Sequence, residues 1–145
     1  MKILLTVLIV LACLANAAAQ FWSPDYAAAQ RLAEEKGKHL VLVFSGSDWC
    51  APCIKLEREI WQDATFQTEA DADFVFYRAD FPRKRANQLS TALADRNASL
   101  AERYNPGGSF PLVMVLTPAG EVRGRTGYQK VAPAEYLAAL RQMVH

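Results

Sequence analysis

Two cysteines stand where a buried strand is expected to give way to a helix. The run at 40–44 is continuously apolar, which is typical of a strand that is covered on both faces. From Cys53 onward, apolar residues recur at intervals of three and four, which predicts a helix over 51–62 with Cys53 on its core side. Pro52 is tolerated in the first turn of that helix, where a missing N–H costs nothing.

This placement of the two cysteines indicates redox chemistry. Cys50 would lie at the positive N-terminus of the helix, which favours the thiolate over the thiol. Cys53 would lie one turn inward, within reach of Cys50. Such a pair can attack a disulfide, form a mixed disulfide, and release the product when the second cysteine closes the ring.

The first part of the chain differs from the rest. An apolar run at 3–15 is shorter than the roughly 20 residues that a membrane span needs, and three alanines precede Gln20. We therefore interpret 1–19 as a signal peptide and 20–145 as one exported domain, periplasmic or secreted.

The same segment has a second interpretation. Residues 10–13 loosely resemble the lipobox of bacterial lipoproteins, in which the cysteine is lipidated and becomes the mature N-terminus. In that case Cys13 would anchor the protein to the membrane. The intact mass of the mature protein distinguishes the two interpretations.

Charge and cysteine content narrow the function classes. Without Lys2, the chain carries 15 basic and 15 acidic residues, which gives no electrostatic case for nucleic-acid binding. The basic run at 83–85 is interpreted as a solvated loop. Only Cys50 and Cys53 remain after cleavage, so the exported domain has no structural disulfide framework, and we expect this pair to be reactive.

The remaining patterns complete an α/β sandwich without internal repeats or long linkers. Further helices are expected at 26–36, 65–72, 87–104 and 133–144. Strands are expected at 39–45, 74–79, 112–116 and 121–126, and the last two would form a hairpin.

Several motifs together resemble the thioredoxin superfamily over essentially the whole mature chain. They are Trp49 directly before the Cys-x-x-Cys pair, the strand that precedes it, and Phe110-Pro111 at the entry to the hairpin. The segments that resemble exported bacterial thioredoxin-like proteins more closely are 46–50, 55–57, 80–82 and 104–106. The resemblance implies a thioredoxin-like fold: a central mixed sheet of about four strands flanked by helices, with an extra N-terminal helix.

The resemblance also implies roles for single residues. Cys50 would be the nucleophile and Cys53 the resolving thiol. Pro111 would be cis and lie opposite the sulfurs, leaving the backbone of Phe110 open to pair with a substrate strand. Trp49 would offer the substrate an apolar platform.

One position departs from the thioredoxin pattern. Many thioredoxins carry a buried aspartate six residues before the first cysteine, thought to handle the proton of the resolving thiol, and Phe44 stands there in this chain. The nearest acids in sequence are Glu57 and Asp48. Either can transfer a proton through water, although surface ion pairing is the more ordinary role for both.

The residues around the two cysteines favour a reductase of disulfides in exported proteins. Pro52 offers no hydrogen-bond donor to the Cys50 thiolate, and Asp48 opposes negative charge there, so the disulfide should be hard to reduce. The compartment outside the inner membrane is oxidising, so a membrane-embedded thiol donor is the expected partner.

Other functions compete with this one. The cysteines could be half of a zinc site, but only His39 and His145 could add to them, and the sequence has no recognisable nucleotide, flavin or metal site, so we expect no cofactor. A chaperone-like module could hold peptides on Trp49 and Phe110-Pro111 without turnover. A purely structural subunit is a third hypothesis.

Overall fold

The computed structural model describes residues 21–145; the predicted signal peptide at 1–19, with Cys13, lies outside them. In chain order the elements are α2 (Tyr26–Lys36), β1 (His39–Ser45), α3 (Ala51–Leu56), a π-helix (Glu57–Trp61), α4 (Ala64–Ala70), β2 (Phe74–Asp80), a short 3₁₀ helix (Arg85–Asn87), α5 (Thr91–Tyr104), β3 (Leu112–Leu116), β4 (Val122–Thr126) and α6 (Pro133–Gln142). Among the described residues, no helix has the length and apolar character needed to cross a membrane.

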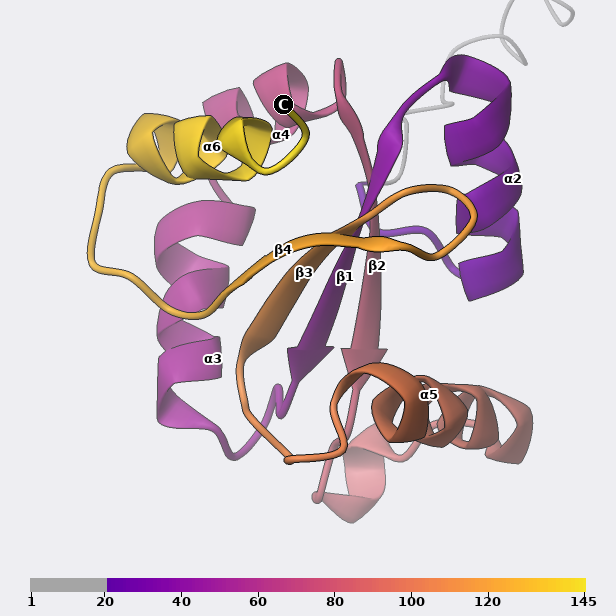
Figure 1. The fold of residues 1–145 in the computed structure, drawn as a ribbon. Coiled ribbons are helices and arrows are strands. Elements are labelled where there is room, and N and C mark those ends of the chain that lie inside the picture. Colours follow the sequence, from indigo (N-terminus) through magenta and orange to yellow (C-terminus); the bar gives the residue numbers. More distant parts are fainter. Residues whose placement is uncertain (1–20) are drawn as a thin grey trace, which may run out of the picture.

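The four strands form one mixed sheet in the order β2-β1-β3-β4 (Figure 1). β1 pairs with β2 in parallel and with β3 antiparallel, and β3 and β4 form the antiparallel hairpin. On the outer side of β2, Trp22 forms a single parallel bridge with Phe76, and the Ser23 N–H donates to the Phe76 carbonyl oxygen at 2.8 Å. The predicted sheet and flanking helices, with the N-terminal helix α2, are confirmed.

Helices cover both faces of the sheet, with α3, α4 and α6 on one side and α2 and α5 on the other (Figure 1). Successive side chains of β1 point to opposite faces of the sheet, so the strand contributes residues to the hydrophobic core on each face. Val41 and Val43 belong to the core under α3, α4 and α6. Leu40, Leu42 and Phe44 belong to the core under α2 and α5. All five are at most 1% exposed, which explains why the run at this strand is apolar throughout.

The predicted helix over 51–62 changes character half-way. After α3 the chain continues as the π-helix, closed by the Gln62 N–H, which donates to the Glu57 carbonyl oxygen at 3.0 Å. Ile60 and Trp61 are consecutive and both buried, and the wider turn lets both reach the core.

The predicted helix at 87–104 begins later than expected. α5 starts at Thr91, because the Ser90 hydroxyl accepts the Leu93 N–H at 3.3 Å and caps the helix there. The residues before the cap form the short 3₁₀ helix instead. All other elements lie within two residues of their predicted bounds.

Candidate active site

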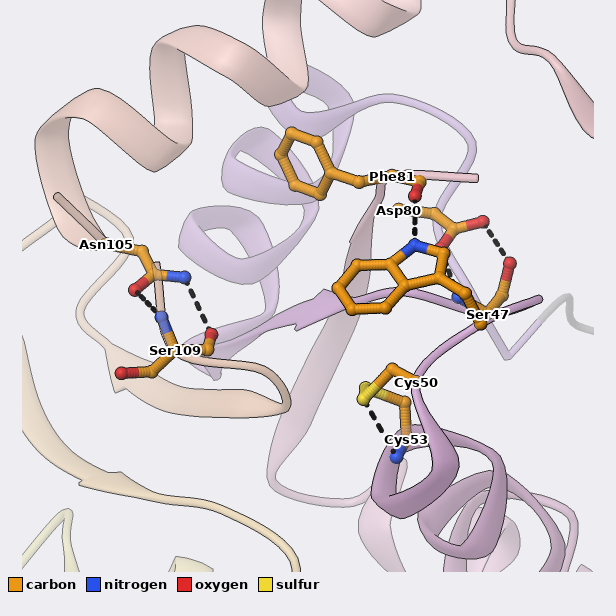
Figure 2. The surroundings of a disulfide bond; sticks show 8 residues. Ser47, Cys50, Cys53, Asp80, Phe81, Asn105 and Ser109 are labelled. Carbon is orange, nitrogen blue, oxygen red and sulfur yellow. Dashed lines mark hydrogen bonds between the residues drawn. A yellow bond between two sulfur atoms is a disulfide. The ribbon is translucent and has the colours of Figure 1, made fainter. Parts of the chain in front are cut away.

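Cys50 and Cys53 form a disulfide at the N-terminus of α3, with their Cα atoms 5.2 Å apart. Cys50 is the N-cap, and its sulfur accepts the Cys53 N–H at 3.3 Å (Figure 2). Cys53 and Leu56 are both buried, as the helical spacing predicts. The reactive pair therefore stands where the backbone N–H groups of a helix begin, with its second sulfur against the core.

Trp49 lies in an aromatic cluster beside the disulfide. Its indole N–H donates to the Phe81 carbonyl oxygen at 2.7 Å. The Phe110 ring meets the rings of Trp49 and Phe81 edge-on, with centroids 5.5 and 5.6 Å away. The peptide bond between Phe110 and Pro111 is cis, as the resemblance implies. Residues from three separate chain segments thus meet around Trp49, the residue directly before Cys50.

The loop before Cys50 is tied to the end of β2. The Ser47 N–H and hydroxyl donate to the two oxygens of the Asp80 carboxylate at 3.0 and 2.5 Å (Figure 2). The buried Asn97 side chain of α5 donates to the Asp80 carbonyl oxygen at 3.1 Å and accepts the Tyr77 hydroxyl at 2.6 Å. This chain of bonds joins α5, β2 and the active-site loop.

Asn105 holds the segment that leads to Phe110. Its side-chain amide donates to the Ser109 carbonyl oxygen at 2.8 Å and accepts the Ser109 N–H at 2.9 Å (Figure 2). Sequence analysis missed the positioning roles of Asn97 and Asn105. For Asn105 a signal existed, since an asparagine between a helix and two glycines is typical of a turn that its own side chain closes.

The Asp48 carboxylate is turned to the loop after β2. It accepts the backbone N–H groups of Arg83 and Lys84, both at 2.9 Å, and the Asn87 amide at 3.1 Å. These donors, with the Arg83 N–H first, lower the pKa of Asp48 below its usual 3.8. The structure therefore places Asp48 in a loop contact.

Glu57 and Cys53 line one pocket of about 250 Å³. Arg78 of β2 lines it too and forms an ion pair with Glu57 at 2.8 Å. Phe44 belongs to the opposite core, so the β1 residue that reaches this pocket is Ser45. Of the two predicted acids, the structure therefore brings Glu57 into the same pocket as Cys53.

The histidines of the zinc hypothesis do not form a metal site with the cysteines. Among residues 21–145, no three His, Cys, Asp or Glu side chains converge as metal ligands would.

The comparisons with known proteins agree with this geometry. The sequence matches the thioredoxin-like domain family over residues 26–144. It is 30% identical over 125 residues to the disulfide bond reductase DsbH of Chlamydia pneumoniae, which covers 86% of this chain and 74% of that protein. The thioredoxin-related protein DsbJ of the same organism is 29% identical over 96 residues, covering 66% of this chain and 27% of that protein.

Two solved structures show the same fold. The DsbH oxidoreductase has a TM-score of 0.78 at 28% identity, with 88% of this chain and 87% of that chain covered. A thioredoxin from Thermus thermophilus has a TM-score of 0.62 at 25% identity, with 85% of each chain covered. This chain belongs to the thioredoxin-like family. With its Cys50–Cys53 pair, it is a thiol–disulfide oxidoreductase.

Proposed function

We propose that the protein reduces disulfide bonds in exported proteins. The signal peptide at 1–19 would direct it to the periplasm or beyond, with anchoring through Cys13 as the alternative. Because that compartment is oxidising, a membrane-embedded thiol donor must return the disulfide to the dithiol. The name of the Chlamydia relative, a disulfide bond reductase, supports this direction.

The reaction exchanges one disulfide for another. The Cys50 thiolate attacks one substrate sulfur, and the substrate S–S bond breaks as its other sulfur leaves as a thiolate. Cys53 then loses its proton, attacks the Cys50 sulfur and releases the second substrate sulfur. Two electrons pass from the cysteine pair to the substrate. The two released substrate thiolates are matched by two protons, one that Cys50 gave up on ionising and one that Cys53 loses before its attack.

One observation carries the reductase direction. Among the described residues, the Cys50 sulfur accepts one hydrogen bond, from the Cys53 N–H. Pro52 has no N–H with which to add another. A thiolate with few donors is less stabilised, which makes the dithiol the stronger reductant. Asp48, whose pKa is held low, adds negative charge two residues before Cys50 and acts in the same sense.

We propose that Glu57 is the base that accepts the proton of the Cys53 thiol. The Cys53 thiol must be deprotonated before it can attack the mixed disulfide, and Phe44 replaces the acid that many thioredoxins use. Glu57 lines the same pocket as Cys53, which has room for a bridging water, and its ion pair with Arg78 fixes the carboxylate there.

Trp49, Phe110 and Pro111 are assigned to substrate binding. All three are half-buried, so part of their apolar surface remains open to solvent near Cys50. The edge-on contact between Trp49 and Phe110 keeps the two rings together as one platform. We expect an extended substrate chain to pair with the backbone of Phe110.

The reduction potential of the Cys50–Cys53 pair tests the proposal. The mature domain is equilibrated in dithiothreitol or glutathione buffers, and the oxidised fraction is measured. We expect a value near about −270 mV, as in thioredoxin, whereas a value near about −120 mV would make the protein an oxidant. If no reversible couple is found and Cys50→Ser still binds peptides, the chaperone-like module replaces this function.

A further inference from the structure

The loop between β2 and α5 carries three consecutive exposed basic residues, Arg83, Lys84 and Arg85. In the part of the chain that the structure describes, none of them belongs to an ion pair. Basic and acidic residues balance over 21–145, so this positive charge is a local feature and not the result of a basic chain.

The loop is fixed against the active site rather than free in solvent. The Asp48 carboxylate, two residues before Cys50, accepts the backbone N–H groups of Arg83 and Lys84. Asp48 bonds to the backbone of these residues and forms no ion pair with their side chains. The backbone of the loop is therefore held against the segment that carries Cys50.

Arg83 also contacts the substrate platform directly. Its guanidinium carbon lies 3.8 Å from the centroid of a Trp49 ring. Stacking of this kind uses the face of the guanidinium and leaves its N–H groups at the edge available for a carboxylate. Positive charge therefore borders the apolar surface that Trp49 and Phe110 form next to Cys50.

We propose that the loop at 83–85 binds acidic residues that flank the reactive disulfide of a substrate protein. The inference rests on the proposed function, because a protein disulfide must reach Cys50. Opposite charges attract over about 8–10 Å at physiological salt, and such attraction raises association rates. The loop would thereby select disulfides with acidic neighbours.

The position of the loop favours a protein segment over a membrane surface. Arg83 lies over the ring of Trp49, the residue directly before Cys50, so a carboxylate bound by Arg83 would lie at the edge of the surface that Trp49 provides. An extended chain can place its cystine at Cys50, an apolar side chain on Trp49 and an acidic side chain at Arg83.

Two synthetic peptides with the same internal disulfide provide the test. One is flanked by aspartates and the other by lysines, and the second-order rate constant of each with the reduced protein is followed by tryptophan fluorescence. At an ionic strength of about 20 mM, we expect the acidic peptide to react at least about fivefold faster. In about 1 M salt the two rates should converge, because the screening length falls to about 3 Å.

Two variants locate the effect. The test variant carries R83Q, K84Q and R85Q. The matched control carries R31Q, K36Q and R123Q. The control loses the same charge from exposed positions on α2 and β4. We expect the ratio of the two rates to fall to about one in the test variant and to be kept in the control.

The outcomes separate this inference from the function on which it rests. If the wild-type protein reduces both peptides equally fast and also reduces neutral bis(2-hydroxyethyl) disulfide, the docking site is wrong and the reductase stands. If it reduces none of the three, the proposed function is wrong. A ratio that falls equally in both variants would assign the effect to net charge. Equal peptide rates, with phosphatidylglycerol vesicles bound by the wild type but not by the test variant, would assign the loop to a membrane surface.

Discussion

The indole ring of Trp49 occupies the space that a side chain at Gly46 would need. The Gly46 carbonyl oxygen also accepts the N–H groups of Trp49 at 3.2 Å and of Cys50 at 2.9 Å. One residue without a side chain therefore sets both the turn that leads to Cys50 and the place of the ring beside it.

We expect Gly46→Ala to displace the Trp49 ring and break its bond to the Phe81 carbonyl oxygen. Overpacking of this kind should lower the free energy of unfolding by about 1–3 kcal/mol, and the rate of peptide disulfide reduction should fall about tenfold. Urea denaturation and the peptide assay measure the two effects. Gly107→Ala is the control, because nothing lies within 4 Å of an added Cβ there. Equal results for both variants would contradict the expectation.

Asn97→Ala should be strongly destabilising. The change removes two hydrogen bonds and leaves the buried Tyr77 hydroxyl without its partner, which should cost about 2–4 kcal/mol. Urea denaturation gives the free energy of unfolding. Ser99→Ala, at an exposed position of α5, should change it by less than about 0.5 kcal/mol. A loss below about 1 kcal/mol for Asn97→Ala would show that the bond network contributes little.

Protonation of Asp48 should lower the stability of the folded protein at acidic pH. Because folding lowers the pKa of this carboxyl below 3.8, the ionised form favours the folded state. Its contribution is complete above about pH 4 to 5 and is lost as the pH falls through the lowered value. We therefore expect the melting temperature of Asp48→Asn to fall less steeply than that of the wild type between about pH 5 and about pH 3. Asp95→Asn, at an exposed position of α5, should retain the wild-type slope.

Glu57→Gln should slow the attack of Cys53 on the mixed disulfide. Loss of a general base acting through water should reduce turnover at pH 7 by about tenfold or more. The difference should shrink at alkaline pH, because hydroxide from solvent then competes with Glu57 as the base that takes the Cys53 proton. Glu59→Gln is the matched control, because Glu59 lies on the same π-helix and bonds to the Tyr128 hydroxyl. Unchanged turnover of Glu57→Gln across the pH range would remove Glu57 from the mechanism.

The sequence predicts the fold well because its strongest signals are local. The apolar run of β1, the helical spacing from Cys53 and the turn residues of the hairpin each depend on near neighbours in the chain. The π-helix could not be predicted in this way, since it depends on the need to bury both Ile60 and Trp61 against the opposite layer. The predicted start of α5 is too early because Leu89 continues the apolar spacing of Leu93 and Leu100, although the helix is capped one residue later, at Ser90.

The site is predictable only in part. The pair of cysteines and Trp49 stand together in the chain, and the motif identifies them. The pairing of Glu57 with Arg78 joins residues from a helix and a strand, and nothing in the spacing of either indicates the contact. In the sequence, Asn97 is likewise one polar residue of a helix, and its role depends on the contact with Tyr77 of β2. Contacts between elements decide these roles, and a single sequence does not display them.

The two edge strands of the sheet, β2 and β4, affect how readily the protein pairs with other extended chains. Part of the outer side of β2 is occupied by the bridge from Trp22, and β4 presents the exposed side chains of Arg123 and Arg125. A free strand edge recruits other extended chains, and positive charge on such an edge opposes pairing with a second copy. If the protein reduces exported chains, as proposed, it would meet extended segments that could pair with a free edge. These two edges therefore favour resistance to aggregation, which would leave the proposed site at Phe110 as the place where an extended chain pairs.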